Sequence, residues 1–400
     1  MQSKEIAIIG GGPAGLMAAD ILSRQGLSVS LYERKPSVGR KFLMAGRGGL
    51  NSTHSENLES FIARYGDKAD FLNPAIQAFS PENLRKWCEE LGEKTFVGSS
   101  GRVFPENFKA SPLLRALIAR LEKQNVKFFI NHEWEGWSGT SLVFKNSDGI
   151  INVNPSATLL ALGGASWQRL GSDGSWVGIL KDQSVDVAPL QPANCGFAVE
   201  WSDIFRERFP GQPLKPVTAS FKGTKIQGEI MITDKGVEGG AIYALSSLLR
   251  EEINQKGSAQ LFLDLKPDLS AEAIEERFKK PRGRLSLTNY FRKILNLSPV
   301  AISLLMEASE RDDLGNLIKN YPLTLNAPFP IEKSISTAGG ITFESINENF
   351  MLINKPGVFV AGEMLDWEAP TGGYLLQACF STAVQAAKGM TSWLSEPKSS

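Results

Sequence analysis

The sequence predicts an α/β protein in which a parallel sheet covered by helices is interrupted by a β-rich insertion that carries a helical cap. Three observations support this fold class: a strand, glycine turn and helix at the amino terminus, a second strand and helix near the carboxyl terminus, and a strand-rich, then helical, stretch between them. With 400 residues the chain is too long for one simple core. We expect one domain from residues 1–187 and 336–400, and an inserted domain from residues 188–335.

The composition argues against several classes of protein. Lys plus Arg and Asp plus Glu each number 43, so no global field attracts nucleic acid or acidic lipid. The three cysteines are far apart and there are only two histidines, which argues against a disulfide framework, a redox dithiol and a His-rich metal site. No apolar run approaches the roughly 18 residues of a membrane-spanning helix, and the first strand starts too early for a signal peptide. We expect a cytoplasmic protein that contacts no membrane and holds no metal.

The chain opens with a pattern typical of a dinucleotide site. Residues 6–9 are a β-branched apolar run that predicts a buried parallel strand, residues 10–15 are a glycine-rich turn, and residues 16–24 have helical spacing. A second strand is expected at residues 27–32 and is followed by Glu33, whose carboxylate can accept both ribose hydroxyl groups. This context favours a nucleotide site over a glycine turn without a ligand.

Each residue type in the turn has a physical reason. Gly10 permits the tight turn, Gly12 lets the backbone approach a diphosphate, and Gly15 allows the helix to pack closely on the strand. Pro13 and Ala14 lie between them at the start of the helix. The free N–H groups and positive dipole end of that helix attract phosphate.

The rest of the chain favours FAD over NAD as the ligand. Arg40 and Lys41 offer two cations to a second set of phosphate oxygens. Residues 357–363 predict a short buried strand, and residues 371–374 open a helix that runs to about residue 393. The amino-terminal end of that helix can face the flavin pyrimidine, where negative charge gathers on reduction. An ordinary strand–helix unit that closes the sheet is the alternative.

A buried strand at residues 158–162 ends at Gly163 and Gly164, a pair that allows close approach to a ligand, with a plain turn as the alternative. The residues that we expect to bind the cofactor are Gly10, Gly12, Pro13, Ala14, Gly15, Glu33, Arg34, Arg40, Lys41, Gly163, Gly164, Gly362, Glu363, Asp366, Thr371, Gly372, Gly373 and Tyr374.

Motifs spread over nearly the whole chain resemble one family when they are taken in order. They lie at residues 9–15, 39–41, 101–105, 109–110, 162–166, 337–340, 361–366 and 371–377. The set resembles the HI0933-like flavoproteins, also called BaiN-like NAD(P)/FAD-dependent oxidoreductases. The resemblance implies a Rossmann-type FAD-binding domain, FAD bound without a covalent link, NAD(P)H as a transient reductant, and hydride transfer from flavin N5 to a conjugated C=C bond of a small molecule.

One loop departs from the family pattern. The family usually has Ser-Gly-x-Gly-Arg-Cys-Asn after the Gly-Arg-Lys motif, whereas residues 45–51 of this chain read Ala-Gly-Arg-Gly-Gly-Leu-Asn. Gly49 replaces the Arg and Leu50 replaces the Cys, while Asn51 is kept. This departure indicates a divergent branch with a changed substrate, or a flavin-binding sensor or scaffold without turnover.

Two further regions have distinct expectations. Short strands between residues 126 and 153 suit a small antiparallel sheet, and Ser111 and Pro112 suit the N-cap and first position of a helix. Arg102 and Lys109 flank an apolar turn, where they fit an anionic substrate, the FAD, or local capping.

The insertion is expected to have a β-unit at about 188–268 and 322–335 and a helical cap at about 269–321. Residues 277–293 of the cap mix cations with Tyr290 and Phe291, a mixture that can hold a phosphate backbone and stack a base. Reduction of uridine in RNA is therefore an alternative function, although a solvated helical face is the more common reading of such a run.

Overall fold

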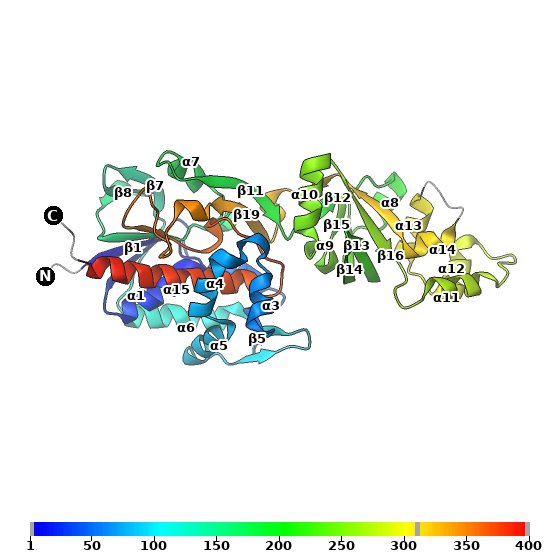
Figure 1. Ribbon diagram of the computed structural model, residues 1–400, viewed down its shortest axis with the longest axis horizontal. Coiled ribbons are helices and arrows are strands. Elements are labelled where there is room, and N and C mark those ends of the chain that lie inside the picture. The colour runs from blue at the N-terminus through cyan, green and yellow to red at the C-terminus, as the bar shows by residue number, and fades with distance from the viewer. Residues whose placement is uncertain (1–3, 309–312, 397–400) are drawn as a thin grey trace. The chain divides into compact units, whose positions relative to one another are not determined.

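The computed structural model describes residues 4–308 and 313–396. Its contacts divide the chain into two compact units, the first made of Met1–Gln191 with Ser336–Ser400 and the second of Pro192–Ile335 (Figure 1). The first break thus falls after Gln191 rather than after residue 187. Residues 309–312, within the expected helical cap, lie outside the described residues.

The first unit is built on a five-stranded parallel sheet. Its strands are β1 (Glu5–Ile9), β2 (Ser28–Glu33), β6 (Lys127–Ile130), β10 (Ala157–Leu160) and β20 (Val358–Val360), in the order β20-β10-β1-β2-β6. Every neighbouring pair is parallel. Because parallel strands share a direction, the loops after β1, β2, β10 and β20 emerge at one edge of the sheet.

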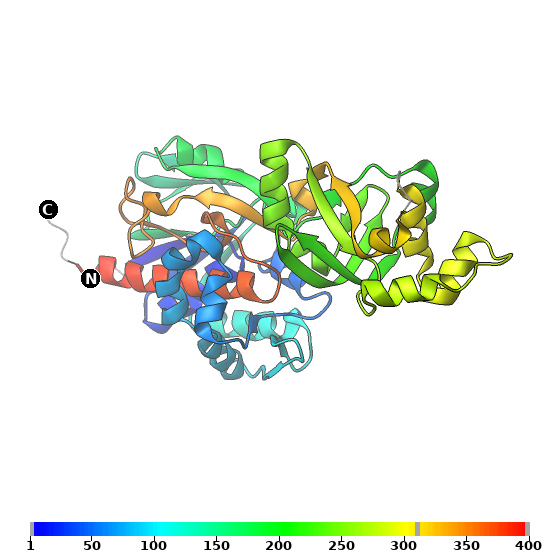
Figure 2. The same cartoon turned by 45° about the vertical axis from the view of Figure 1, so that its right-hand side comes forward.

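Helices cover this sheet. The helix α1 (Pro13–Arg24) packs on α15 (Tyr374–Ser395), which also packs on α4 (Ala69–Ala78). The long red helix α15 lies beside the blue and cyan segments in both views (Figure 2). Its buried face includes Phe380 and Met390, which belong to the same core as β1 and β10. The first and last helices of the unit are therefore packed together although they are far apart in sequence.

Smaller elements complete the first unit. Two three-stranded antiparallel sheets have the orders β3-β5-β4 and β7-β8-β9, and β11 pairs with β19. The bounds are α2 (Arg40–Ala45), β3 (Thr53–His54), α3 (Leu58–Ala63), α5 (Pro81–Glu90), β4 (Thr95–Val97), β5 (Arg102–Pro105), α6 (Ala110–Lys123), β7 (Glu133–Ser138), β8 (Ser141–Asn146), β9 (Gly149–Val153), α7 (Trp176–Lys181), β11 (Val187–Ala193) and β19 (Ser336–Ile341).

Two local expectations are wrong. The strand β6 (Lys127–Ile130) joins the parallel sheet beside β2 instead of the small antiparallel sheet. As an edge strand it is only half-buried, and the short apolar run at residues 128–130 suits a strand of either sheet, so the strand's own sequence does not indicate its partner. The helix α6 begins at Ala110 after the N-cap Lys109, which places Ser111 and Pro112 inside the first turn. Pro112 is tolerated there because first-turn N–H groups have no partner within the helix.

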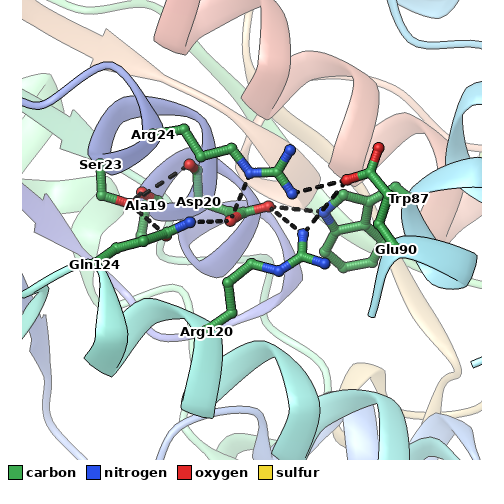
Figure 3. A network of polar contacts seen from close by, with 8 residues as sticks. All are labelled: Ala19, Asp20, Ser23, Arg24, Trp87, Glu90, Arg120 and Gln124. Atoms are coloured by element: carbon green, nitrogen blue, oxygen red, sulfur yellow. Dashed lines mark hydrogen bonds and ion pairs between the residues drawn. The ribbon is translucent and has the colours of Figure 1, made fainter. Parts of the chain in front are cut away.

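A buried carboxylate joins three helices of this unit (Figure 3). Asp20 on α1 has no exposed surface, and its Oδ2 accepts from Trp87 Nε1 at 2.8 Å and Arg120 Nη1 at 3.3 Å. Its Oδ1 accepts from Arg24 Nε at 3.2 Å and Gln124 Nε2 at 3.3 Å. The donors come from α1, α5 and α6 or its C-cap, so this network fixes α1 against its neighbours.

The second unit has its own core and a seven-stranded sheet in the order β17-β16-β13-β14-β15-β12-β18. Four helices form the cap on this unit: α11 (Ala271–Phe278), α12 (Leu287–Leu295), α13 (Pro299–Glu307) and α14 (Leu314–Lys319). The other bounds are β12 (Phe197–Ala198), α8 (Asp203–Arg208), β13 (Pro213–Phe221), β14 (Thr224–Thr233), β15 (Gly236–Glu238), α9 (Gly240–Tyr243), α10 (Ser246–Lys256), β16 (Ala259–Asp264), β17 (Tyr321–Leu325) and β18 (Ala327–Pro328). Over residues 4–308 and 313–396, no helix combines the length and apolarity needed to cross a bilayer.

Candidate active site

The loops at the carboxyl edge of the parallel sheet bring glycines into close backbone contact. A Cβ added to Gly10 would lie 2.3 Å from the Ala161 carbonyl oxygen, and one on Gly15 would lie 1.9 Å from the Gly10 carbonyl oxygen. A Cβ on Gly362 would lie 2.9 Å from the Cβ of Ala14. Side chains are therefore excluded where β1, β10, β20 and the start of α1 meet.

Gly12 differs from these glycines. A Cβ at Gly12 would have no heavy atom within 4 Å, so open space lies in front of this residue. Gly12 is the N-cap of α1, Pro13 follows it at the first helical position, and no side chain caps the helix. Backbone N–H groups at such an end are unsatisfied and attract anions. This end of α1 has the chemistry and the room for a diphosphate.

Glu33 lies at the end of β2 beside the glycine turn. Its Oε2 accepts from the Gly11 N–H at 2.9 Å and its Oε1 from the Lys35 N–H at 2.8 Å. Burial raises the pKa of Glu33, while these two N–H groups oppose that shift. A carboxylate has about four lone-pair sites, so acceptor capacity remains for ribose hydroxyl groups.

Arg34 makes protein contacts instead of facing open space. Its Nη1 lies 2.7 Å from Asp173 Oδ2 and its Nη2 donates to the Gly171 carbonyl at 2.6 Å. A Cβ on Gly171 would lie 3.8 Å from Glu33 Oε1. Arg34 thus holds the turn at residues 171–173 next to the ribose-binding candidate.

Lys41 joins the loops that follow β10 and β20. Its Nζ lies 2.6 Å from Glu363 Oε2 and 2.7 Å from Ser166 Oγ. The other oxygen of Glu363 accepts from the Thr337 N–H at 3.1 Å. Gly164 allows this contact network, because a Cβ there would lie 2.3 Å from Thr337 Oγ1. The sequence predicts that Lys41 and Glu363 each contact the cofactor. In the structure they form an ion pair with each other.

The start of α15 is a second uncapped helix end. Its N-cap Gly373 has φ 98°, no side chain caps the helix, and a Cβ there would lie 2.5 Å from the Thr53 backbone. Tyr374 OH donates to Glu56 Oε1 at 2.5 Å, and burial is the main cause that raises the pKa of Tyr374, with Glu56 adding to it. Because its hydroxyl is engaged, Tyr374 can offer a ligand its backbone rather than its side chain.

The surroundings of three other residues that we expect to bind the cofactor can be described briefly. Asp366 is paired with Lys68 at 3.0 Å. Gly372 has φ 142°, and a Cβ there would lie 2.6 Å from the Tyr374 ring. Thr371 is half-buried in front of this turn. Glycine at 372 is thus required by the backbone and by the adjacent ring.

Buried polar atoms without a partner test whether FAD fits. Among the described residues, such atoms include Arg40 Nε, Asn51 Oδ1, Thr53 Oγ1 and Ser172 Oγ. An unsatisfied buried polar atom is costly and needs an explanation, and a ligand with phosphates, ribityl hydroxyls and a heterocycle supplies partners of the right kind. Gly163 lies beside one of these atoms, since a Cβ there would be 3.3 Å from Ser172 Oγ.

Thr53 and Ser172 were not singled out by sequence reasoning. Ser and Thr hydroxyl groups usually bond to nearby backbone, so nothing in the sequence indicates that Thr53 on β3 and Ser172 after β10 lack a partner. Thr53 has no exposed surface and Ser172 is 6% exposed. With these atoms included, the residues present fit FAD.

The two residues that depart from the family loop, Gly49 and Leu50, both pack against neighbouring residues. Gly49 has φ 112°, and a Cβ there would lie 3.3 Å from the Phe108 ring and 3.5 Å from the Phe104 ring. Leu50 is fully buried in the core, and its N–H donates to the Phe108 carbonyl at 2.8 Å. The places of the family Arg and Cys are thus occupied by an aromatic contact and a core contact.

The expected stacking role of the cap aromatics is wrong. Phe291 is fully buried, and Tyr290 is 8% exposed with its hydroxyl near the carbonyls of Phe278 and Lys280. These rings fill the core of the cap because α12 turns its apolar face inward. The exposed cations of this segment are Lys279, Lys280, Arg282, Arg284, Arg292 and Lys293.

Comparison with known proteins agrees with this geometry. The HI0933-like protein Rossmann domain matches residues 4–389. The chain is 25% identical over 406 residues to the 3-dehydro-bile acid delta(4,6)-reductase of Clostridium scindens, covering 96% of this chain and 98% of the relative. It is 23% identical over 418 residues to a ribosomal RNA dihydrouridine synthase of Haemophilus influenzae, covering 96% and 98%.

A solved structure shares the fold. The 3-ketosteroid delta1-dehydrogenase of Sterolibacterium denitrificans superposes with a TM-score of 0.55 at 11% identity, over 97% of this chain and all of that one. The α/β class predicted from the sequence is thereby confirmed, as is the resemblance to one family. The chain belongs to the HI0933-like family of FAD-dependent oxidoreductases.

Proposed function

We propose that the chain uses NAD(P)H to reduce a conjugated C=C bond of a small organic acceptor, with FAD carrying the hydride to one carbon and a proton from water completing the reduction at the other. The observation that supports FAD as the carrier is the open space at Gly12 in front of an uncapped helix. Family membership and the name of the Clostridium relative support the chemistry.

The residues at the sheet edge would hold the cofactor in a definite order. Glu33 would accept ribose hydroxyl groups, the first turn of α1 would bind the diphosphate, and the first turn of α15 would bind the flavin pyrimidine. When bound, FAD supplies the ability to accept a hydride and to pass it on. The protein contributes binding, orientation and the positive ends of two helix dipoles.

The reductive step is tested by mixing the holoenzyme with NADH or NADPH without oxygen. We expect the flavin absorbance to bleach with at least one of the two, because the hydride moves from the nicotinamide to the flavin. Photoreduction of the same sample shows that the bound flavin can be reduced at all. Bleaching by light but by neither nucleotide would remove the nicotinamide from the proposal.

The acceptor is tested with a steroid dienone, the class that the name of the Clostridium relative suggests. We expect reduced holoenzyme to regain its flavin colour when the dienone is added, and not when the matching saturated ketone is added. Turnover with such an acceptor also excludes a flavin-binding sensor without activity.

Reduction of uridine in RNA is the second candidate, favoured by the name of the Haemophilus relative and by the exposed cations of the cap. Lys280, Arg282 and Arg284 are exposed, whereas Lys279 is paired with Glu276 at 2.5 Å. If RNA is the substrate, changing these three to Gln should abolish RNA reduction and spare flavin reduction by NAD(P)H. A matched control changes the exposed Lys225, Lys235 and Lys333. Equal loss in both triple variants would count against the cap as an RNA site.

A further inference from the structure

An exposed aromatic surface lies on the three-stranded sheet of the first unit and on the turn that follows it. Its rings are Phe96 on β4, Phe104 on β5 and Phe108, with centroids 5.0–5.9 Å apart. Phe96 and Phe104 are direct cross-strand partners. Phe108 is 49% exposed and Phe96 and Phe104 are half-buried, so part of this apolar surface remains in water.

The backbone of Phe108 is held in a strained conformation. Phe108 has φ 59°, in the left-handed region that is unfavourable for a bulky residue. Its N–H donates to the Pro105 carbonyl and its carbonyl accepts from the Leu50 N–H, both at 2.8 Å. Strain of this kind clusters at functional sites, because the surrounding structure must be built to hold it.

Cations surround the aromatic surface. Arg102 lies two residues before Phe104 on β5, on the same side of the strand, and Lys109 follows Phe108. Arg47 lies two residues before Gly49, where an added Cβ would lie 3.3 Å from the Phe108 ring and 3.5 Å from the Phe104 ring. All three are exposed, and none has a carboxylate within ion-pair distance in the described part of the chain. Glu106 lies in the same turn, and Glu93 accepts from Asn107 of that turn at 2.8 Å, so these two carboxylates offset part of the charge of the three cations.

The aromatic surface lies close to the flavin end of the candidate cofactor site, with the buried residues Val103 and Thr53 between them. Val103, next to Phe104, pairs with Thr53 on β3. Thr53 touches Gly373 at the start of α15, and its own Oγ1 is buried without a partner. One strand of a small sheet therefore separates the aromatic surface from the backbone that would bind the flavin pyrimidine.

We propose that the aromatic surface with Arg47, Arg102 and Lys109 binds the NAD(P)H that reduces the flavin. Aromatic rings stack on a planar heterocycle, and Arg and Lys bind phosphate oxygens. Three cations without ion pairs match a dinucleotide with several negative charges better than an acceptor with a single carboxylate. The proposal rests on the proposed function, because it gives a place to the reductant which that function requires.

Direct binding of NADP⁺ to the holoenzyme, measured by calorimetry, tests the site without turnover. Phe108→Asn removes the ring and keeps a residue that tolerates φ above zero, so the fold should be unharmed. We expect the Kd for NADP⁺ to rise about tenfold, the scale of one lost base–aromatic stack. The thermal midpoint and the flavin content should not fall.

The cations are tested by a triple variant, Arg47→Gln with Arg102→Gln and Lys109→Gln. We expect the Kd to rise about 100-fold at low salt and to lose most of its salt dependence. A matched triple variant of Lys123, Lys127 and Lys145, which are exposed elsewhere in the first unit, should bind NADP⁺ as the parent does.

Several outcomes would overturn the assignment. Unchanged NADP⁺ binding in both variants would reject it, even if NAD(P)H bleaches the parent flavin. If the variants change only the KM of the acceptor, RNA binding or self-association, the surface binds the acceptor, RNA or a second copy of the chain instead of NAD(P)H. Failure of NAD(P)H to bleach the parent protein would instead reject the proposed function, which separates the two results.

Discussion

Replacing Gly12 with valine is expected to give a folded protein that retains no FAD. Gly12 has φ −81°, which any residue adopts, and an added Cβ would have no protein atom within 4 Å, so the fold has room for a larger residue there. The loss of a glycine N-cap costs at most about 1 kcal/mol of folding free energy. The new side chain would fill the space that the diphosphate needs, so binding is lost while folding is kept.

Two matched variants isolate this effect. Gly178→Val on α7 also meets no atom within 4 Å, and it should remain folded and yellow. Gly10→Val should lose stability, because its Cβ would lie 2.3 Å from a carbonyl oxygen at φ 110°. The measurements are flavin absorbance after desalting and the thermal midpoint. Full flavin content in Gly12→Val protein would contradict the diphosphate assignment.

Removal of the buried carboxylate by Asp20→Ala is expected to lower the free energy of unfolding by about 3–5 kcal/mol. Asp20 has no exposed surface, and the change leaves the indole N–H of Trp87 without its acceptor and Arg120 without its nearer carboxylate, while Glu90 stays 3.7 Å from Arg120 Nη1 (Figure 3). Loss of one partner from a buried ion pair costs more than the pair itself contributes, since a charge stays behind in the interior.

Chemical denaturation followed by fluorescence measures this loss. The control is Arg24→Ala, whose side chain is 37% exposed and whose removal should cost less than about 1 kcal/mol. Asp20 lies eight residues after Gly12, roughly 12 Å along the helix, so folded Asp20→Ala protein should still bind FAD. A change below 1 kcal/mol would show that the network is not part of what stabilises the unit.

The parts of the fold that can be predicted from the sequence are those whose patterns lie within one short stretch of the chain. The strand, glycine turn and helix at residues 6–24 can be predicted from that short segment alone, because its apolar run, turn residues and helical spacing all indicate the same structure. The place of the edge strand β6 is not evident from the sequence, because its partner, β2, is almost a hundred residues away and the short apolar run at residues 128–130 suits a strand of either sheet.

The contacts of the candidate site depend on topology in the same way. Lys41 follows β2 and Glu363 follows β20, two strands that are separated in the sheet by β1 and β10, and nothing near either residue in the sequence indicates the other. The missing partners of Thr53 and Ser172 are likewise properties of the assembled loops. Sequence patterns can name residue types suited to phosphate or ribose, but which of them stay free is decided by packing between distant segments.

The contact of α1 with α15 has a consequence for how the chain is made. The apolar face of α1 emerges first from the ribosome, and its partner emerges only with residues 374–395. The second unit is one continuous segment with its own core, so it can fold while the first waits. If synthesis halts before residue 374, the first unit is therefore left with exposed apolar surface. Chaperones and proteases act on chains in this state.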